Sequence, residues 1–371
     1  MKKYAAATAA VFAMSVAAQA GGLDRDPLTT SMLFEEGTYV ELSYSNVSPE
    51  VSGVGVNSLF AGRNSGNISD SYSVARLSFR QDITEALSFA LISSEPYGSN
   101  VNYGPSTYPF ANSTAALSTN MLTAALRYEF DNGFSAYAGL NALAVDTGVY
   151  VSTPTFAYRL TGDSDYELGH MVGVAYERPD IALRVALTYF SEIEVGMSGA
   201  EGVGAAGTAS GAVATSSSAF NVTMPESLLL EMQSGVSENT LVFGSVRWTG
   251  WDGFQIRPNR YPAGALVNYT DDVYTYTLGV GHRLNENWSV SASVDYEAAT
   301  GGFKGNLGPT DGRRSFALGA EYSRDNYSVT AGIRRIEIGD AQTILSTTGP
   351  MTSSFSGNSA TAVGIRFGYQ F

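Results

Sequence analysis

The chain has 371 residues, a formal net charge of −14 at pH 7 and no cysteine. The acidic balance argues against a basic nucleic-acid-binding surface, and the lack of cysteine excludes disulfides, thiolate catalysis and cysteine-ligated metals. The 40 glycines, 22 tyrosines and 18 phenylalanines, with only 15% charged residues, are typical of strands, turns and aromatic girdles rather than of a soluble acidic enzyme.

The chain begins with the pattern of a secretory signal. Lys2 and Lys3 precede an apolar run that ends in Ala18-Gln19-Ala20, the small-x-small pattern that signal peptidase accepts. We expect residues 1–20 to be removed and the mature chain to begin at Gly21. No later window holds the ~18 consecutive apolar residues that a transmembrane helix requires. A membrane location would therefore require a closed barrel, in which neighbouring strands satisfy the backbone groups of each other.

Alternating apolar and polar runs, bounded by turn residues, predict fourteen strands in the mature chain. Because fourteen is an even number, both termini should lie on the same side of the membrane. The predicted strands cover residues 38–47, 70–81, 85–95, 119–130, 134–150, 164–178, 181–195, 219–235, 238–249, 271–284, 287–298, 312–324, 326–340 and 359–371.

The connections between these strands alternate between short and long. Tight links such as Asp131-Asn132-Gly133 and Asn285-Glu286 contain the residues that turns favour, and we expect them on the periplasmic side. The long links, among them residues 151–163 and 196–218, match the outer loops of bacterial barrels. Residues 196–218 are rich in Gly, Ala and Ser, a composition that predicts a mobile loop.

Successive side chains of a strand point to opposite faces, which allows the lipid side to be assigned. In residues 288–297, one face carries Trp288, Val294 and Tyr296, whereas the other carries Asp295 and four serine or glutamate residues. The last strand repeats this pattern and ends on an aromatic residue at the chain terminus. Apolar residues outside and polar residues inside predict a barrel in the bacterial outer membrane.

Several segments resemble the FadL family, the outer-membrane transporters of long-chain fatty acids and other hydrophobic compounds. The resemblance covers most of the mature chain and rests on the order and spacing of its motifs. The similar segments are Met224-Pro225-Glu226-Ser227, then Trp248-Thr249-Gly250-Trp251-Asp252-Gly253-Phe254, then Asp271 to Arg283 followed by Trp288, and Glu95-Pro96-Tyr97-Gly98 after the third strand.

The resemblance implies an N-terminal plug inside the barrel. Gly21, Gly22 and Leu23 fit the start of such a plug, but the family's Asn-Pro-Ala motif is absent. The predicted fold is therefore an all-β, 14-stranded antiparallel transmembrane outer-membrane β-barrel, residues 38–371, with a short N-terminal plug segment, residues 21–37. A monomer is expected.

The resemblance also implies passive transport, with capture of an apolar ligand in the lumen and lateral release through a gap at the third strand. The gap would lie at Ser94, Pro96, Tyr97 and Gly98, because proline removes a ladder donor and glycine leaves room. The alternative is that these residues merely begin a loop.

A fatty acid would need a cationic partner for its carboxylate in the lumen. Arg247, Arg334 and Arg366 fall on the inward face and are the candidates for this contact. Alternatively, lumenal arginines pair with carboxylates of the protein, for which Glu129, Glu192, Asp295 and Glu321 are available.

Apolar residues of the outer loops are candidates for the first capture of a ligand. They are Tyr108, Phe110, Phe156, Tyr158 and Leu160, and they could form an exposed patch, complete the aromatic girdle or pack between loops. Outer-membrane lipid and lipopolysaccharide are expected neighbours of the barrel, although the sequence shows no basic patch for lipopolysaccharide.

An enzyme is not expected. The two histidines, His170 and His282, both fall on the lipid-facing side and have no serine and carboxylate arranged as a triad requires. No catalytic residue, metal or cofactor is therefore predicted. A general diffusion porin for small polar solutes remains the alternative function, because an acidic barrel with a shortened plug also allows a water-filled lumen. The favoured substrates are long-chain fatty acids, with aromatic hydrocarbons and other apolar molecules left open.

Overall fold

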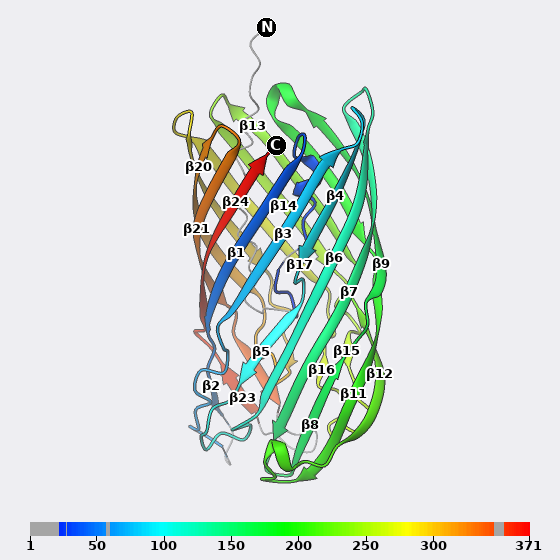
Figure 1. Cartoon of the computed structure of the whole chain (residues 1–371). Helices are drawn as coiled ribbons and strands as arrows, with labels where there is room; N and C mark the ends of the chain where they lie inside the picture. The colour runs from blue at the N-terminus through cyan, green and yellow to red at the C-terminus, as the bar shows by residue number, and fades with distance from the viewer. Residues whose placement is uncertain (1–21, 27, 57–59, 345–351) are drawn as a thin grey trace.

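The computed structural model describes residues 22–26, 28–56, 60–344 and 352–371; the predicted signal segment and Gly21 lie outside them. Eighteen strand segments form one sheet. Its first strand, β1 (Tyr39–Glu50), runs antiparallel to its last, β24 (Ser359–Gln370), with Tyr39 opposite Gln370. The sheet is therefore a closed barrel (Figure 1), in which neighbouring strands satisfy the backbone groups.

Four strands of the wall are each divided into two segments, so that the eighteen segments make a 14-strand antiparallel barrel. The predicted number of strands and the predicted fold class are confirmed. After β1, the wall consists of β3 (Tyr72–Asp82), β4 (Leu87–Ser94) with β5 (Gly98–Asn102), β6 (Thr114–Glu129), β7 (Phe134–Ser152), β8 (Phe156–Asp163) with β9 (Glu167–Arg178), β10 (Leu183–Phe190) with β11 (Ile193–Ala205), β12 (Ser216–Met224) with β13 (Ser227–Ser237), β14 (Thr240–Thr249), β17 (Val273–Arg283), β18 (Trp288–Glu297), β20 (Arg313–Arg324), β21 (Tyr327–Ile338) and β24.

Short elements complete the loops and the N-terminal segment. Two small sheets lie outside the wall: β2 (Gly53–Gly55), β19 (Phe303–Lys304), β22 (Ala341–Ile344) and β23 (Thr352–Phe355) form one, and β15 (Gln255–Ile256) and β16 (Val267–Asn268) form the other. The 3-10 helices are η1 (Ser31–Phe34), η2 (Pro179–Ile181) and η3 (Ser210–Ala212). Among the described residues, no helix is both long and apolar enough to cross a membrane.

The tight turns lie at one end of the barrel, together with the C-terminus, and the long loops lie at the other end (Figure 1). Gly133 at φ 82° and Asp325 at φ 52° supply the left-handed conformation that two of these turns need. Short turns face the periplasm in outer-membrane barrels, and the long-loop end is therefore the extracellular end.

The side chains alternate as predicted. Along β18, Trp288, Val294 and Tyr296 are exposed on the outer surface, whereas Asp295 and Glu297 are buried inside. An apolar outer band around a polar, charged interior is the arrangement that suits a barrel surrounded by lipid.

Two segments that the sequence predicts as loops are largely strands. In residues 151–163, β8 pairs with both β7 and β11, and in residues 196–218, β11 and β12 extend a hairpin. The prediction of a mobile glycine-rich loop is wrong for these strands. The glycines allow close approach of backbones, since a Cβ at Gly199 would overlap the carbonyl of Thr161.

Glu192 does not face the lumen, which corrects its predicted position. Ser191 donates its backbone N–H to the carbonyl of His170 (2.9 Å) where β10 ends and β11 begins. This irregularity shifts the alternation, because Phe190 and Ile193 are both buried and Glu192 is exposed.

Aromatic rings cover glycines on neighbouring strands inside the barrel. Gly279 lies directly opposite Phe243, and a Cβ at Gly279 would overlap the phenyl ring. We expect Gly279→Val to destabilise the barrel by about 1–3 kcal/mol through overpacking. Urea unfolding in lipid vesicles, followed by tryptophan fluorescence, would measure the loss. Gly148→Val is the matched control, since its Cβ would meet nothing within 4 Å; equal stability of the two variants would contradict the prediction.

Candidate functional site

The third strand of the wall is interrupted in the outer half of the barrel. The ladder between β3 and β4 ends at the pair Leu77–Ser93, and β5 resumes the strand at Gly98. The next contact on this side is the isolated bridge between Ser69 and Val101. The predicted gate residues Ser94, Pro96, Tyr97 and Gly98 lie at this interruption, and Pro96 removes one backbone donor from the strand.

The N-terminal segment takes the place of a ladder partner at the interruption. Arg25 donates its backbone N–H to the Pro96 carbonyl (2.9 Å), and Gly98 donates its N–H to the Leu23 carbonyl (2.8 Å). Asp24 forms an isolated antiparallel bridge with Tyr97. Backbone groups that the broken strand exposes are thus satisfied by residues 23–26 instead of by β3.

Three consecutive charged residues, Asp24, Arg25 and Asp26, attach this segment to different parts of the wall; we call them the charged clip. Asp24 pairs with Arg247 of β14. Asp26 pairs with Arg76 of β3 at 2.6 Å. Arg25 hydrogen-bonds to the side-chain oxygen of Asn100 on β5. The clip therefore crosses the lumen and joins strands that are distant from one another in the wall.

Arg25 makes two further contacts at the interruption. Its guanidinium lies 4.4 Å from the ring centroid of Tyr72 and 3.9 Å from the carboxylate of Glu95. A cation above an aromatic face is attracted by the ring quadrupole. The Arg25 side chain is thus held from both edges of the break, by Tyr72 at β3 and by Glu95 beyond the end of β4.

Burial makes the charges of the clip costly. It raises the pKa of the Asp26 carboxyl, although Arg76 opposes the rise, and it lowers the pKa of the Arg25 guanidinium, although Tyr72 and Glu95 oppose the fall. In both groups, the effect of desolvation on the pKa is therefore larger than the opposing effect of the neighbouring charges. Buried ion pairs of this kind specify position more than they stabilise it.

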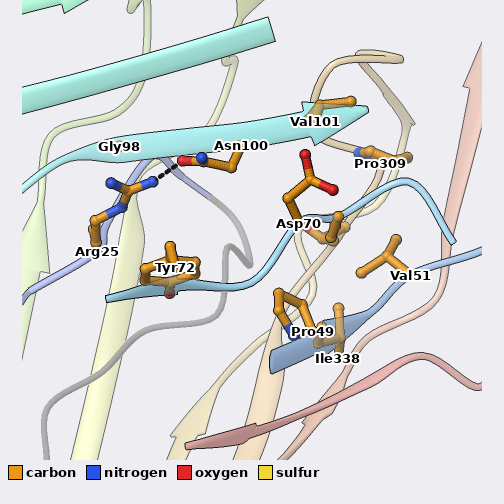
Figure 2. Close-up of a pocket in the computed structure, with 12 residues that line it drawn as sticks. Arg25, Pro49, Val51, Asp70, Tyr72, Gly98, Asn100, Val101, Pro309 and Ile338 are labelled. Carbon is orange, nitrogen blue, oxygen red and sulfur yellow. Dashed lines mark hydrogen bonds between the residues drawn. The ribbon is translucent and has the colours of Figure 1, made fainter. Parts of the chain in front are cut away.

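A small cavity of about 20 Å³ remains beside the clip, which is room for about one water molecule. Figure 2 shows Arg25, Tyr72, Gly98 and Asn100 around it, with Asp70 toward the outer loops. A Cβ at Gly98 would lie 2.6 Å from the guanidinium carbon of Arg25. Glycine at this position leaves room for the Arg25 side chain, which occupies the break in the wall.

Other described residues of the N-terminal segment are also buried inside the barrel. Gly22 packs on Trp251, since a Cβ there would lie 2.5 Å from the indole nitrogen, and Leu23 is only 3% exposed. Nearer the periplasmic end, Leu33 of η1 accepts a hydrogen bond from Arg127 (3.2 Å), and Phe34 packs edge-on against Tyr137. The segment therefore contacts the wall at several levels of the lumen.

An aromatic cluster lies directly against the clip, and Tyr97 is its only member among the predicted site residues. Trp251 contacts Tyr97, Phe254 and Tyr269 with ring centroids 5.8, 4.9 and 5.3 Å apart. Trp251 and Phe254 belong to a motif that supports the family resemblance, and that motif is the signal that could have indicated their place in the site. Trp251 is fully buried and Phe254 is only 5% exposed, so these rings form an apolar packing layer beside the clip.

Of the residues predicted for outer capture, Tyr108, Phe110, Tyr158 and Leu160 are buried and Phe156 is half-buried. An exposed patch is therefore wrong, because these side chains pack together with the lumenal aromatic residues. Tyr108 stacks on Tyr103 at 5.5 Å, and its hydroxyl hydrogen-bonds with Ser353 (2.8 Å).

The three arginines predicted to bind a carboxylate all face carboxylates of the protein. Arg247 pairs with Asp24, and Arg334 pairs with Asp295. Arg366 lies 3.4 Å from Glu41 and 3.9 Å from Glu321.

Neither histidine lies in the lumen. His170 and His282 are exposed on the outer surface, as predicted. His282 Nδ1 lies 3.0 Å from the hydroxyl of Thr240, and the ring of His170 is 6.2 Å from that of Tyr189. Within the described ranges of the chain, neither histidine is placed with a serine and a carboxylate in the arrangement of a catalytic triad.

Comparison with known proteins connects these features to a family. The family described as outer membrane protein transport protein (OMPP1/FadL/TodX) matches residues 4–371. No curated protein matches the chain.

Solved structures share the fold at low sequence identity. A FadL homologue from Pseudomonas aeruginosa is 15% identical with a TM-score of 0.77, covering 96% of this chain and 97% of its own. The toluene transporter TodX of Pseudomonas putida is 14% identical with a TM-score of 0.68, covering 95% and 96%. The monoaromatic hydrocarbon channel CymD is 15% identical with a TM-score of 0.63, covering 92% and 90%.

Breaking the charged clip should release the N-terminal segment. The chain has no cysteine, so Leu23→Cys introduces a single labelling site at a buried position. Adding Arg76→Gln leaves the buried Asp26 carboxylate without its cation, a loss that typically costs about 3–5 kcal/mol. We expect maleimide labelling at position 23 to accelerate roughly tenfold or more.

The control for this experiment is Arg63→Gln in the same Leu23→Cys background. Arg63 lies in an outer loop, where it donates to the Thr107 carbonyl (2.9 Å), and it does not contact the clip. If Arg76→Gln and Arg63→Gln gave the same labelling rate, the clip would not hold the segment.

Proposed function

We infer the function from one premise, that the chain belongs to the outer membrane protein transport family (OMPP1/FadL/TodX). It is an outer-membrane β-barrel of a family of hydrophobic compound transporters. We propose that it takes up hydrophobic molecules passively, as a monomer. Transfer from water into hydrocarbon is favourable by ~0.8 kcal/mol per methylene, and the process therefore needs no energy source in the outer membrane.

The observation that carries the mechanism is the broken third strand closed by the N-terminal segment. A molecule that enters the lumen from the extracellular end meets the aromatic cluster of Trp251, Phe254 and Tyr269 beside the break. When the charged clip withdraws, the ligand leaves sideways into the membrane between β3 and β5. Residues 22–37 act in this proposal as the plug.

The resting state of this proposal is closed at the break. Leu23 and Arg25 fill the break and form backbone hydrogen bonds with the third strand there. The Arg25 side chain fills the space above Gly98. The clip is releasable because its buried charges cost desolvation that their ion pairs offset only in part. A general diffusion porin would instead keep a permanently open, water-filled lumen.

The lumenal arginines already face carboxylates of the protein, and this favours uncharged substrates in our proposal. A fatty acid carboxylate would have to displace Asp24, Asp295 or Glu41 from the arginine that each now faces. We therefore place apolar molecules without a fixed charge, such as aromatic hydrocarbons, first among the substrates. Long-chain fatty acids, which the sequence favours, are the second candidate, and the aliphatic and aromatic surface of the lumen suits their chains.

Filling the break should block uptake. Gly98→Val puts methyl groups where the Arg25 side chain lies and narrows the opening between β3 and β5. We expect uptake of radiolabelled toluene by cells to fall roughly tenfold or more, with normal barrel assembly. Gly104→Val is the matched control, because a Cβ at Gly104 would meet nothing within 4 Å. Unchanged uptake, together with steady ion conductance of the pure wild-type protein, would identify a porin instead.

Arg334, which does not contact the charged clip, should act on stability and not on the uptake of neutral molecules. Arg334→Gln strands the buried Asp295 carboxylate and should cost about 3–5 kcal/mol in urea unfolding. The double variant Arg334→Gln with Asp295→Asn should recover most of the loss, because neither partner is then charged. Toluene uptake by the double variant should equal that of the wild type. A selective loss of oleic acid uptake in the double variant would instead assign Arg334 to carboxylate binding.

A further inference from the structure

The outer surface of the wall carries two arginines at the extracellular end of β20 and β21. Arg314 and Arg335 both point away from the lumen and are exposed, whereas the neighbouring Arg313 and Arg334 point inward and are buried. In the register of this strand pair, Arg314 lies opposite Glu337 and Phe316 lies opposite Arg335. The two outward arginines are therefore diagonal neighbours on one face.

Arg335 is held in a fixed orientation by hydroxyl groups of β24. It donates one hydrogen bond to Thr361 (2.8 Å) and one to Ser359 (2.7 Å). No carboxylate forms an ion pair with Arg335 anywhere in the described part of the chain. Its charge is thus positioned but not neutralised, and the hydroxyls orient the planar guanidinium for a further anionic partner.

The carboxylates nearby already have partners. Glu337 pairs with Arg314, and Asp340 accepts the backbone N–H of Gly357 (3.1 Å). The formal charge of the whole chain is −14, which gives no general attraction for anions. Anion binding at this place would therefore depend on the local geometry of Arg335 and Arg314.

The arginines lie at the edge of the apolar outer band. The next outward residues toward the periplasm are Phe316 on β20, Ile333 on β21 and Val363 on β24, each about half exposed. On the extracellular side the wall gives way to loop residues, among which Asp340 is polar and exposed. This boundary is the level at which lipid head groups meet hydrocarbon, and arginine side chains there can reach phosphates.

Two recesses meet at this boundary. One, of about 530 Å³, is lined mainly by apolar side chains of the outer wall, including Leu278, Val294 and Phe316. The other, of about 640 Å³, lies toward the loops and is lined by both polar and apolar groups. Both include Tyr296, Arg314, Arg335 and Glu337 in their linings. A molecule with an acyl chain and a phosphate head would fill both recesses at once.

From this arrangement we propose that Arg335, with Arg314, binds a phosphate of lipid A, the phosphorylated glycolipid of the extracellular leaflet. The position favours lipid A over a glycerophospholipid, because the site faces the leaflet on the long-loop side. The acyl chains lie along the apolar recess beside Tyr296 and Phe316, and the phosphate accepts hydrogen bonds from the guanidinium groups. The site lies on the outside of the wall and is separate from the lumen and from the broken strand.

Native mass spectrometry of the purified full-length barrel with added bisphosphorylated lipid A tests the proposal. The variants are compared at the lipid A concentration that half-saturates the wild type. We expect Arg335→Gln to bind a smaller fraction of lipid A there, because its affinity falls roughly tenfold. Arg314→Gln with Arg335→Gln should lower it further. Arg335→Lys keeps the charge but not the planar fork and should give an intermediate affinity. Arg324→Gln, at an exposed periplasmic turn, is the control and should bind as the wild type does.

Two further ligands separate the possible sources of binding. Lipid A without its phosphates and phosphatidylglycerol should both bind more weakly than bisphosphorylated lipid A, and neither should respond strongly to Arg335→Gln. Equal affinity of wild type and Arg335→Gln for bisphosphorylated lipid A would overturn the proposal. If phosphate-free lipid A bound as tightly as bisphosphorylated lipid A, the apolar recess alone would account for binding and the proposal would be wrong. If phosphatidylglycerol bound as tightly, the site would not select lipid A, and the proposal would also be wrong.

Discussion

The structure depends on one constraint, that backbone donors and acceptors in an apolar medium must be bonded within the protein. Fourteen strands closed on themselves meet it around almost the whole circumference. The exception is the third strand, where the ladder with its neighbour ends at Leu77–Ser93. The N-terminal segment supplies the missing partners there, so that the same residues complete the wall and occupy the lumen.

The N-terminal segment is held at the break less extensively than a strand of the wall is held. A strand held by two neighbours along its full length cannot leave without the barrel coming apart, but residues 22–26 are held by a few backbone bonds and three charged side chains. Burial shifts the pKa values of Asp26 and Arg25 against their charged forms despite their partners. The pairs therefore specify where the segment docks while adding little to its stability. The opening that we propose at this break depends on these contacts.

The interior and the exterior of the barrel use arginine in different ways. Inside, Arg247, Arg334 and Arg366 each face carboxylates of the protein, which partly neutralise their charges. Outside, Arg335 is oriented by hydroxyls at the border of the apolar band. Arg334 and Arg335 are consecutive residues of β21, and successive side chains of a strand point to opposite faces. The guanidinium of Arg334 therefore faces the lumen and that of Arg335 faces outward.

The sequence alone determined the number of strands, the lipid-facing side of strands such as residues 288–297 and the end at which the turns lie, because period-2 alternation and turn chemistry are local. The interruption of the third strand lies at Pro96 and Gly98, where the family resemblance implied a gap and the residues by themselves also allowed the start of a loop. The sequence could not show that Arg247 would face Asp24, since these residues are 223 positions apart and meet only when the barrel closes around the segment. The shift at Ser191 that turns Glu192 outward, and the burial of Tyr108 and Tyr158, likewise depend on contacts between strands. The tertiary structure decided these points because a side chain's partner across a lumen is set by the closure and register of the whole sheet, to which no local pattern corresponds.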